Sequence, residues 1–217
     1  MTIKALLFDF DGTLLDTNEL IIQSFMHIFD EKFPGQYTKD DCIPLIGPSL
    51  RQTFERLTPN EVDEMIAKYR EWNEAHHDEL VKEYDGVVET LQQLHAMGIR
   101  LVIVSSKVHV NIVKGLHVLG VAELFEYIVG ADDVEHVKPH PEPIEKALNY
   151  LQLSKDEVIM VGDNSHDIEG GQNAGVKTAG VSWTIRGEAY LQTFNPDYML
   201  TTMSDIISIV RELNEEN

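Results

Sequence analysis

Two carboxylates stand at the end of an apolar segment near the start of the chain. Residues 3–8 are apolar except at position 4, Asp9 and Asp11 come next, and Gly12-Thr13 follow them. This pattern predicts a buried strand that ends in two acids and a tight turn, where an open α/β sheet forms its site. Two carboxylates held close together repel each other, and a bound cation is the common remedy. An ordinary strand with an Asp-Gly turn is the alternative for this segment alone.

Three later segments present polar residues in a similar way. Two are apolar stretches that end in polar side chains, and the third is a proline-rich loop. Ser105 or Asp163 could instead cap the helix that follows it, and Lys138 could be a surface charge. The polar residues of these segments are Ser105 and Ser106, Lys138, and Asp163 with Asp167.

From residue 84 onward, short apolar segments alternate with helical patterns. Such alternation predicts parallel βαβ units with right-handed crossovers, and the polar residues then gather at the carboxyl ends of the strands. The fold class is therefore α/β, with a doubly wound parallel sheet. Strands are expected at 3–8, 100–104, 127–130, 157–161 and 176–181.

Residues 17–82 break this alternation. Helices are expected at 18–33, 39–46 and 59–80, and a further helix begins after 47–49. The pattern predicts a small helical cap domain, 17–82, inserted into a core domain formed by 1–16 and 83–217. A cap on two tethers can open and close over a pocket.

The composition excludes several classes of protein. The chain has 217 residues and a formal net charge of −20, which argues against binding to nucleic acid or to an anionic membrane. Cys42 is the single cysteine, so an internal disulfide and a cysteine-based zinc site are excluded. The first apolar run is too short for a signal peptide or a membrane span, and a cytoplasmic protein is expected.

The ordered motifs, with a helical insert after the first of them, resemble the haloacid dehalogenase superfamily over nearly the whole chain. The resemblance implies a Mg²⁺-dependent phosphohydrolase in which Asp9 attacks phosphorus and becomes an aspartyl phosphate. Asp11 would be the general acid and then the general base. Mg²⁺ would be held by Asp9, Asp163 and the backbone carbonyl of Asp11, and Asp167 would orient these ligands.

The same resemblance implies the contacts to the phosphoryl group. Ser105 would donate a hydrogen bond to it, with Ser106 as a weaker candidate, and Lys138 would neutralise the carboxylates and the transferring group. The Gly12-Thr13 turn would let the backbone approach the phosphate. Lys107 is expected to be a solvated side chain.

Further segments resemble the cytosolic inorganic pyrophosphatases of Gram-positive bacteria within this superfamily. The implied partner is a small phosphate anion, pyrophosphate, and the protein would be a monomer or a weak homodimer. Gly47 and Arg51 would bind the anion at a helix start, although an exposed Arg at such a start is also common. The segments that carry this resemblance are 17–22, 34–37, 46–50, Asp133 with Lys138-Pro139, and 177–185.

Other branches of the superfamily fit less well. Asp11 argues against the dehalogenase branch, and Ile21 stands where β-phosphoglucomutases have a cap histidine. A phosphonate hydrolase would need a cap lysine as a Schiff base, but Lys39, Lys68 and Lys82 lie in acid-rich surroundings. Phosphoglycolate phosphatases share the core and much of the cap and remain the alternative. A degenerate ligand-binding protein would lack one of the motif residues, and none is missing.

Overall fold

The computed structural model describes residues 2–215, which form two compact units. The first unit contains Met1–Leu15 and Glu83–Asn217, and the second contains Asp16–Lys82. The second unit is thus an insertion into the first. The chain passes between the units through two paired strands of two residues each, β2 (Leu15–Asp16) and β3 (Lys82–Glu83). Neither strand is predicted from the sequence, because two residues carry no periodicity.

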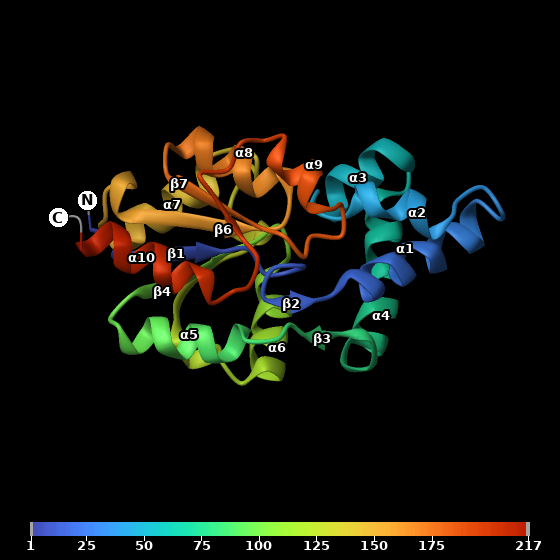
Figure 1. Cartoon of the computed structure of the whole chain (residues 1–217). Helices are drawn as coiled ribbons and strands as arrows, with labels where there is room; N and C mark the ends of the chain where they lie inside the picture. The colour runs from blue at the N-terminus through green and yellow to red at the C-terminus, as the bar shows by residue number, and fades with distance from the viewer. Residues whose placement is uncertain (1, 216–217) are drawn as a thin grey trace. The chain divides into compact units, whose positions relative to one another are not determined.

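A six-stranded parallel sheet forms the centre of the first unit (Figure 1). Its strands are β1 (Ala5–Phe8), β4 (Arg100–Val104), β5 (Phe125–Val129), β6 (Val158–Gly162), β7 (Lys177–Val181) and β8 (Tyr198–Leu200). They are arranged in the order β5-β4-β1-β6-β7-β8. The strand that is first in sequence therefore lies inside the sheet, between β4 and β6. This arrangement confirms the predicted α/β class.

The central strands β1 and β6 are apolar along their whole length. Every residue of β1 and of β6 is buried, as a parallel sheet covered on both faces requires. The edge strand β8 is not predicted from the sequence. It has three residues, of which Tyr198 and Met199 are half-buried, so it lacks the continuous buried apolar run of β1 and β6.

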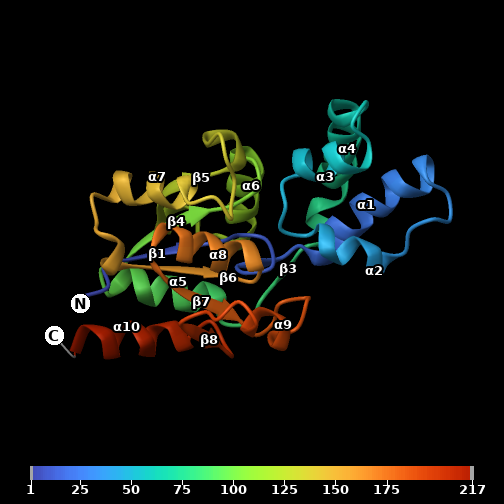
Figure 2. The same ribbon diagram turned by 90° about the horizontal axis from the view of Figure 1, so that it is seen from above.

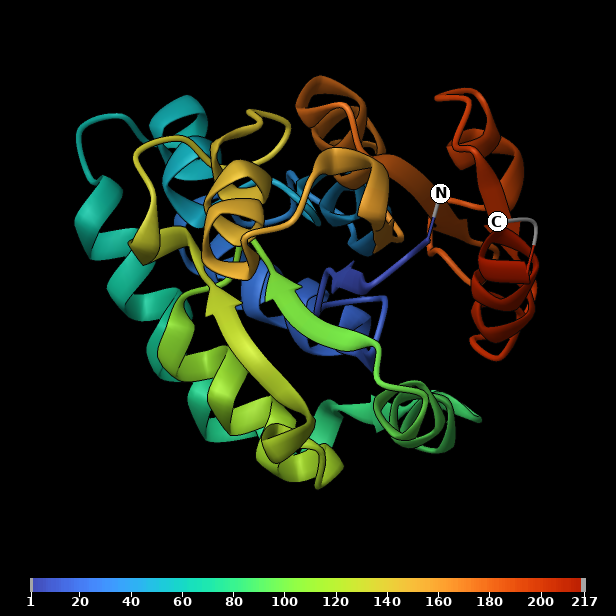
Figure 3. The same cartoon turned by 90° about the vertical axis from the view of Figure 1, so that its left-hand side faces the viewer.

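Helices cover both faces of this sheet. They are α5 (Val87–Ala96), α6 (His109–Leu119), α7 (Glu142–Leu151), α8 (Ser165–Ala174), α9 (Glu188–Gln192) and α10 (Asp205–Glu215), with 3₁₀ turns η2 (Ala122–Leu124), η3 (Ala131–Asp133) and η4 (Lys155–Glu157). Figure 3 shows α7 and α8 on one face and α5, α6 and α10 on the other. Right-handed crossovers explain the change of face, because the chain moves outward from β4 to β5 and then returns to β6.

Apolar side chains of α7 and α8 fix these helices on the sheet. Ile144 and Leu151 of α7 belong to one buried cluster with Leu7 and Met160 of the strands. Helix α8 approaches β7 so closely that a Cβ at Gly171 would lie 2.4 Å from the Thr178 side chain. The helix that begins beside the strand end of β6 is therefore held firmly.

The second unit is helical around an aromatic core. Its helices are α1 (Asn18–Lys32), α2 (Lys39–Cys42), α3 (Leu50–Leu57) and α4 (Val62–Leu80), with the 3₁₀ turn η1 (Ile43–Leu45). Helices α1 and α4 pack against each other (Figure 2). The ring of Phe25 lies 5.8 Å from Phe29, 5.9 Å from Phe54 and 4.9 Å from Tyr69, between centroids. The last helix begins at Val62 rather than at the expected residue 59, because the preceding residues form a turn closed by the Glu61 amide and the Thr58 carbonyl.

Membrane insertion has no candidate segment among residues 2–215. No helix there combines the length and the apolar character that a membrane span requires.

Candidate active site

The carboxyl ends of β1, β4 and β6 lie next to one another at one edge of the sheet (Figure 1). Asp9 follows β1, Ser105 follows β4 and Asp163 follows β6. All three are buried, with exposed fractions of 8%, 6% and 2%. The structure thus brings together the residues that the sequence places after three separate strands.

Lys138 reaches this edge from the loop between η3 and α7. Its ammonium donates to Asp9 Oδ1 at 3.0 Å, to Asp167 Oδ1 at 2.6 Å and to the carbonyl oxygen of Val104 at 2.6 Å. The side chain is 2% exposed. A lysine ammonium has three donors, and all three are used here, so Lys138 connects the ends of two strands to the start of α8.

Asp167 is held by the geometry at the start of α8. Asn164 is the N-cap residue, and its backbone N–H donates to Asp167 Oδ2 at 2.9 Å. The other oxygen, Oδ1, accepts the bond from Lys138. Because both oxygens bind protein donors, this carboxylate is suited to positioning its neighbours, and that role stays a prediction.

Three carboxylates share this buried space with a single lysine. One oxygen each from Asp9, Asp163 and Asp167 lies within 4.8 Å of the others. Burial raises the pKa of Asp9 to about 6, despite the nearby Lys138. Burial and the charges of Asp167 and Asp9 raise the pKa of Asp163 well above its ordinary value. Burial opposes the charge of Lys138, but Asp167 and Asp9 outweigh it and raise the pKa of that lysine.

These shifts identify an excess of negative charge that a cation would balance. A divalent cation with oxygen ligands would remove the repulsion that makes ionisation of Asp9 and Asp163 costly. The donor set is made of carboxylate oxygens, which suit hard cations. The residues present therefore fit a metal site.

Two glycines make room for the carboxylates. A Cβ at Gly12 would lie 2.5 Å from Asp163 Oδ2, and the residue has a φ of +76° that favours glycine. A Cβ at Gly162 would lie 2.3 Å from the Asp167 side chain. Gly12 is thus needed for the approach of the β1 turn to Asp163, while its contact with a phosphate stays a prediction.

Asp11 pairs with Lys107, which corrects one expectation. The Lys107 ammonium donates to the two Asp11 oxygens at 2.8 and 3.1 Å, and its side chain is only 10% exposed. It also lies 5.9 Å from the centroid of the Phe10 ring. The prediction of a solvated Lys107 is therefore wrong, because a carboxylate and an aromatic face lie within its reach. The signal was its place three residues after the end of β4, close to Ser105.

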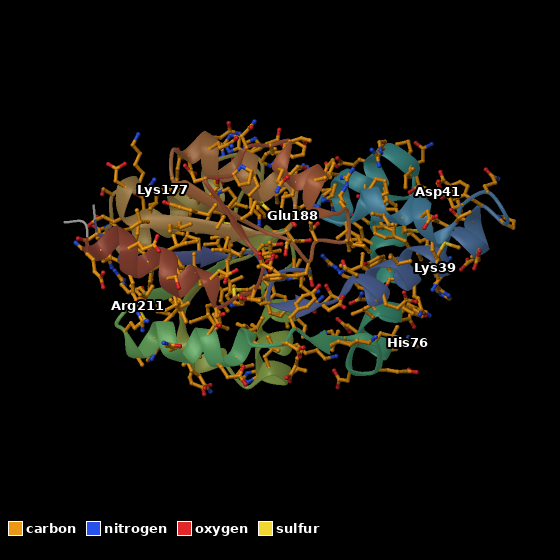
Figure 4. The ribbon with its side chains drawn as sticks, in the orientation of Figure 1. Lys39, Asp41, His76, Lys177, Glu188 and Arg211 are labelled. Carbon is orange, nitrogen blue, oxygen red and sulfur yellow. The ribbon has the colours of Figure 1, made fainter. Side chains whose placement is uncertain are left out.

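Two other cations of this unit lie away from the carboxyl ends of the strands. Figure 4 shows Lys177 at the start of β7 and Arg211 on α10, both toward the opposite end of the sheet. Lys107 and Lys138 are thus the lysines that the described structure places among the predicted site residues.

The hydroxyl residues have defined partners. Thr13 donates to Asp163 Oδ1 at 3.2 Å, which fixes the turn after β1. The Ser105 hydroxyl oxygen accepts from the Lys107 backbone N–H at 3.3 Å, so its own hydrogen is available for a ligand. Phosphate contacts by Thr13, Ser105 and the half-buried Ser106 stay predictions.

Gly47 and Arg51 belong to the second unit. Arg51 lies on α3, is 58% exposed and pairs with Asp63 at 2.7 Å. Gly47 precedes the N-cap residue Ser49 and has a φ of +110°. Their part in anion binding stays a prediction.

The chain is similar to known proteins along most of its length. A family described as haloacid dehalogenase-like hydrolases matches residues 6–181. Proteins named pyrophosphatase PpaX from Halalkalibacterium halodurans and from Bacillus anthracis are 55% and 51% identical to the chain. The first similarity covers 97% of this chain and 98% of the relative, and the second covers 99% of both.

Solved structures share the same fold. A haloacid dehalogenase-like protein from Bacteroides fragilis has a TM-score of 0.88 and 26% identity, over 94% of this chain and all of that one (100%). A haloacid dehalogenase-like family hydrolase from Streptococcus pneumoniae has a TM-score of 0.84 and 24% identity, over 95% and 98% of the two chains. The predicted core sheet with a helical insertion after its first strand is confirmed.

Proposed function

Since the chain belongs to the haloacid dehalogenase-like hydrolases, we propose that it hydrolyses inorganic pyrophosphate to two phosphates, with Asp9 as nucleophile and Mg²⁺ as cofactor. One observation supports pyrophosphate as the substrate: the similarity to two proteins named pyrophosphatase, at 51% and 55% identity. It extends over 98% and 99% of those relatives, so it includes the helical insertion as well as the core. The buried cluster of Asp9, Asp163 and Lys138 supports the chemistry.

Asp9 and Asp163 are the side chains assigned to the metal, with the backbone carbonyl of Asp11 as a further ligand. When bound, Mg²⁺ would neutralise the carboxylates and draw negative charge from the phosphoryl oxygens. Asp167 would keep these ligands in place, because its own oxygens bind Lys138 and the Asn164 N–H.

The reaction follows from the two acids after β1. An Asp9 oxygen attacks one phosphorus of pyrophosphate, the bond from that phosphorus to the bridging oxygen breaks, and Asp11 gives a proton to the departing phosphate. Water then attacks the aspartyl phosphate, Asp11 takes a proton from it, and the carboxylate of Asp9 is regenerated. Lys138 lies 3.0 Å from Asp9 Oδ1 and would stabilise the charge that builds there.

Lys107 is assigned the role of holding the Asp11 side chain in position. Its ammonium binds both oxygens that exchange the proton, and it comes from the loop after β4 that also carries Ser105. The two hydrogen bonds hold the Asp11 carboxyl group in one orientation at the end of β1. Lys107 is therefore a positioning residue that acts through Asp11.

The second unit, Asp16–Lys82, is assigned the role of a cap that selects the substrate. Arg51 and the helix start after Gly47 are its candidates for holding the second phosphate. The enzyme is proposed to act in the cytoplasm as a monomer or a weak homodimer. The absence of any possible internal disulfide, with Cys42 as the one cysteine, agrees with a reducing compartment.

A comparison of substrates tests the proposal. With Mg²⁺ present, kcat/KM would be measured for pyrophosphate, phosphoglycolate and a hexose phosphate. We expect pyrophosphate to be the best substrate and a chelator to remove its turnover. Asp9→Asn should abolish phosphate release with an unchanged circular dichroism spectrum.

Each other outcome has a definite meaning. A higher kcat/KM for phosphoglycolate would reject pyrophosphate and retain the hydrolase. Phosphate release by Asp9→Asn near the wild-type rate would reject the nucleophile. No metal-dependent turnover of any substrate would favour a ligand-binding protein on this fold.

A further inference from the structure

The loop that carries Lys138 presents a second group of metal-ligating side chains on its outer side. His136 and His140 flank the lysine in sequence, and Glu142 begins α7. Their side chains are 61%, 48% and 31% exposed, whereas that of Lys138 is 2% exposed. One ligand atom of each lies within 4.8 Å of the other two.

The distances within this group suit a metal ion. Glu142 Oε2 lies 3.1 Å from His136 Nδ1 and 4.0 Å from His140 Nδ1. Ligand atoms bound at about 2.0–2.1 Å in a tetrahedral site are about 3.4 Å apart. The two observed separations lie on either side of that value, so a small adjustment of exposed side chains would complete the site.

The Nδ1 atoms of the two imidazoles have different partners. His136 Nδ1 donates to Glu142 Oε2 at 3.1 Å, and a metal ion would displace that proton. The His140 Nδ1 atom accepts the backbone N–H of Glu142 at 3.2 Å, so this nitrogen carries a lone pair. The rings of His136 and His140 stack with centroids 4.6 Å apart and an angle of 28°. A metal ion would replace the N–H of Glu142, which lies at an exposed helix start and can turn to water.

The carboxylate of Glu142 is already fixed in place. Its Oε1 accepts the Glu135 backbone N–H at 2.8 Å, and its Oε2 accepts the His136 backbone N–H at 2.9 Å. A ligand held by the backbone loses little freedom when it binds an ion. These two bonds also place the carboxylate against the segment that carries His136.

We propose that His136, His140 and Glu142 form a second metal site, which takes a transition-metal ion such as Zn²⁺. Two imidazoles and one carboxylate are a ligand set that zinc uses, whereas Mg²⁺ prefers oxygen ligands alone. The exposure of the group leaves a fourth position to water. The site spans the loop on both sides of Lys138, so an ion bound there ties together the two ends of the segment that carries this lysine.

Calorimetric titration of the full chain with Zn²⁺ tests the site, in the presence of saturating Mg²⁺ and without substrate. We expect binding of one Zn²⁺ per chain at His136, His140 and Glu142. Loss of a residue that only supports a ligand weakens metal binding by about 10–100-fold. His136→Ala and His140→Ala, which remove ligands, should therefore weaken Zn²⁺ binding by at least about tenfold.

Matched variants complete the experiment. His95→Ala and His117→Ala remove exposed histidines of α5 and α6 and should leave Zn²⁺ binding unchanged. Unchanged Zn²⁺ affinity in both His136→Ala and His140→Ala would overturn the proposal. So would loss of the binding in Asp163→Asn alone, because the ion would then lie among the buried carboxylates. Circular dichroism of each variant checks its fold, and the result does not depend on which phosphate compound the enzyme hydrolyses.

Discussion

The two units of this protein differ in where their charged side chains lie. The first unit buries Asp9, Lys138, Asp163 and Asp167 at the end of its sheet, with exposed fractions of 8% or less. In the second unit, ion pairs such as Arg51–Asp63 and Lys68–Glu31 lie at the surface. The core of the second unit is instead a cluster of aromatic rings.

The buried charged side chains of the first unit belong to the proposed reaction site, whereas the surface ion pairs of the second unit keep their charges in water. Buried charges are costly, and removal of one partner leaves the other unpaired, which typically costs about 3–5 kcal/mol. Exposed ion pairs contribute about 0–1 kcal/mol. The charges of the first unit are thus expected to be sensitive to any substitution, whereas those of the second unit should tolerate it unless they touch the substrate.

Lys138→Met should have the largest effect. It removes the cation that binds Asp9 and Asp167, so both the transition state and the carboxylate pair lose their partner. We expect kcat/KM for pyrophosphate to fall by about 10²–10³-fold. Lys155→Met, at an exposed position, is the control. A rate within a few-fold of wild type would show that the buried lysine has no part in catalysis.

The stability of the metal-free protein should depend on pH through Asp9. Burial raises the pKa of Asp9 from 3.8 to about 6, so the folded state favours the protonated carboxyl group. The stability linked to this group is therefore present below about pH 4 and lost as pH rises through 6. In EDTA, the free energy of unfolding of wild type should fall by about 3 kcal/mol relative to Asp9→Asn between pH 4 and 7.

Urea unfolding at several pH values measures this difference. Added Mg²⁺ should restore the stability of wild type at pH 7 and leave Asp9→Asn less affected, because the ion compensates the ionised carboxylate. A difference between the two proteins that stays constant with pH would contradict the account of the buried cluster.

Lys107→Met should have a smaller effect on turnover. We expect kcat to fall by about tenfold, and KM to change little, because Lys107 acts through Asp11 rather than through the substrate. Lys107→Arg keeps a cation beside Asp11 and should retain most of the turnover. An equal loss of kcat in Lys107→Met and Lys107→Arg would show that Lys107 has only a structural part.

Arg51→Ala should have the smallest effect on stability. Its partner Asp63 is exposed, so the free energy of unfolding should change by no more than about 1 kcal/mol. If the second unit selects the substrate, KM for pyrophosphate should rise several-fold. Arg56→Ala on the same helix is the control. Equal KM values for the two variants would remove Arg51 from the substrate site.

The sequence predicts those features that depend on local patterns. The central strands β1 and β6 are recognisable because each is a continuous apolar run. The acids that follow them must meet once the strands are parallel. The contact between Lys107 and Asp11 joins residues 96 positions apart, and spacing along the chain cannot reveal it. His140 is an ordinary loop residue in the sequence, because only the folded loop brings it to His136 and Glu142.

The place of β1 inside the sheet has a consequence for synthesis of the protein. The strand that presents Asp9 leaves the ribosome first, yet its neighbours β4 and β6 begin at Arg100 and Val158. At about 5–20 residues per second, this apolar segment waits roughly 8–30 s before both flanks exist. During that interval the apolar segment can pair incorrectly with other apolar segments. Newly made chains should therefore need protection by chaperones until β6 has emerged.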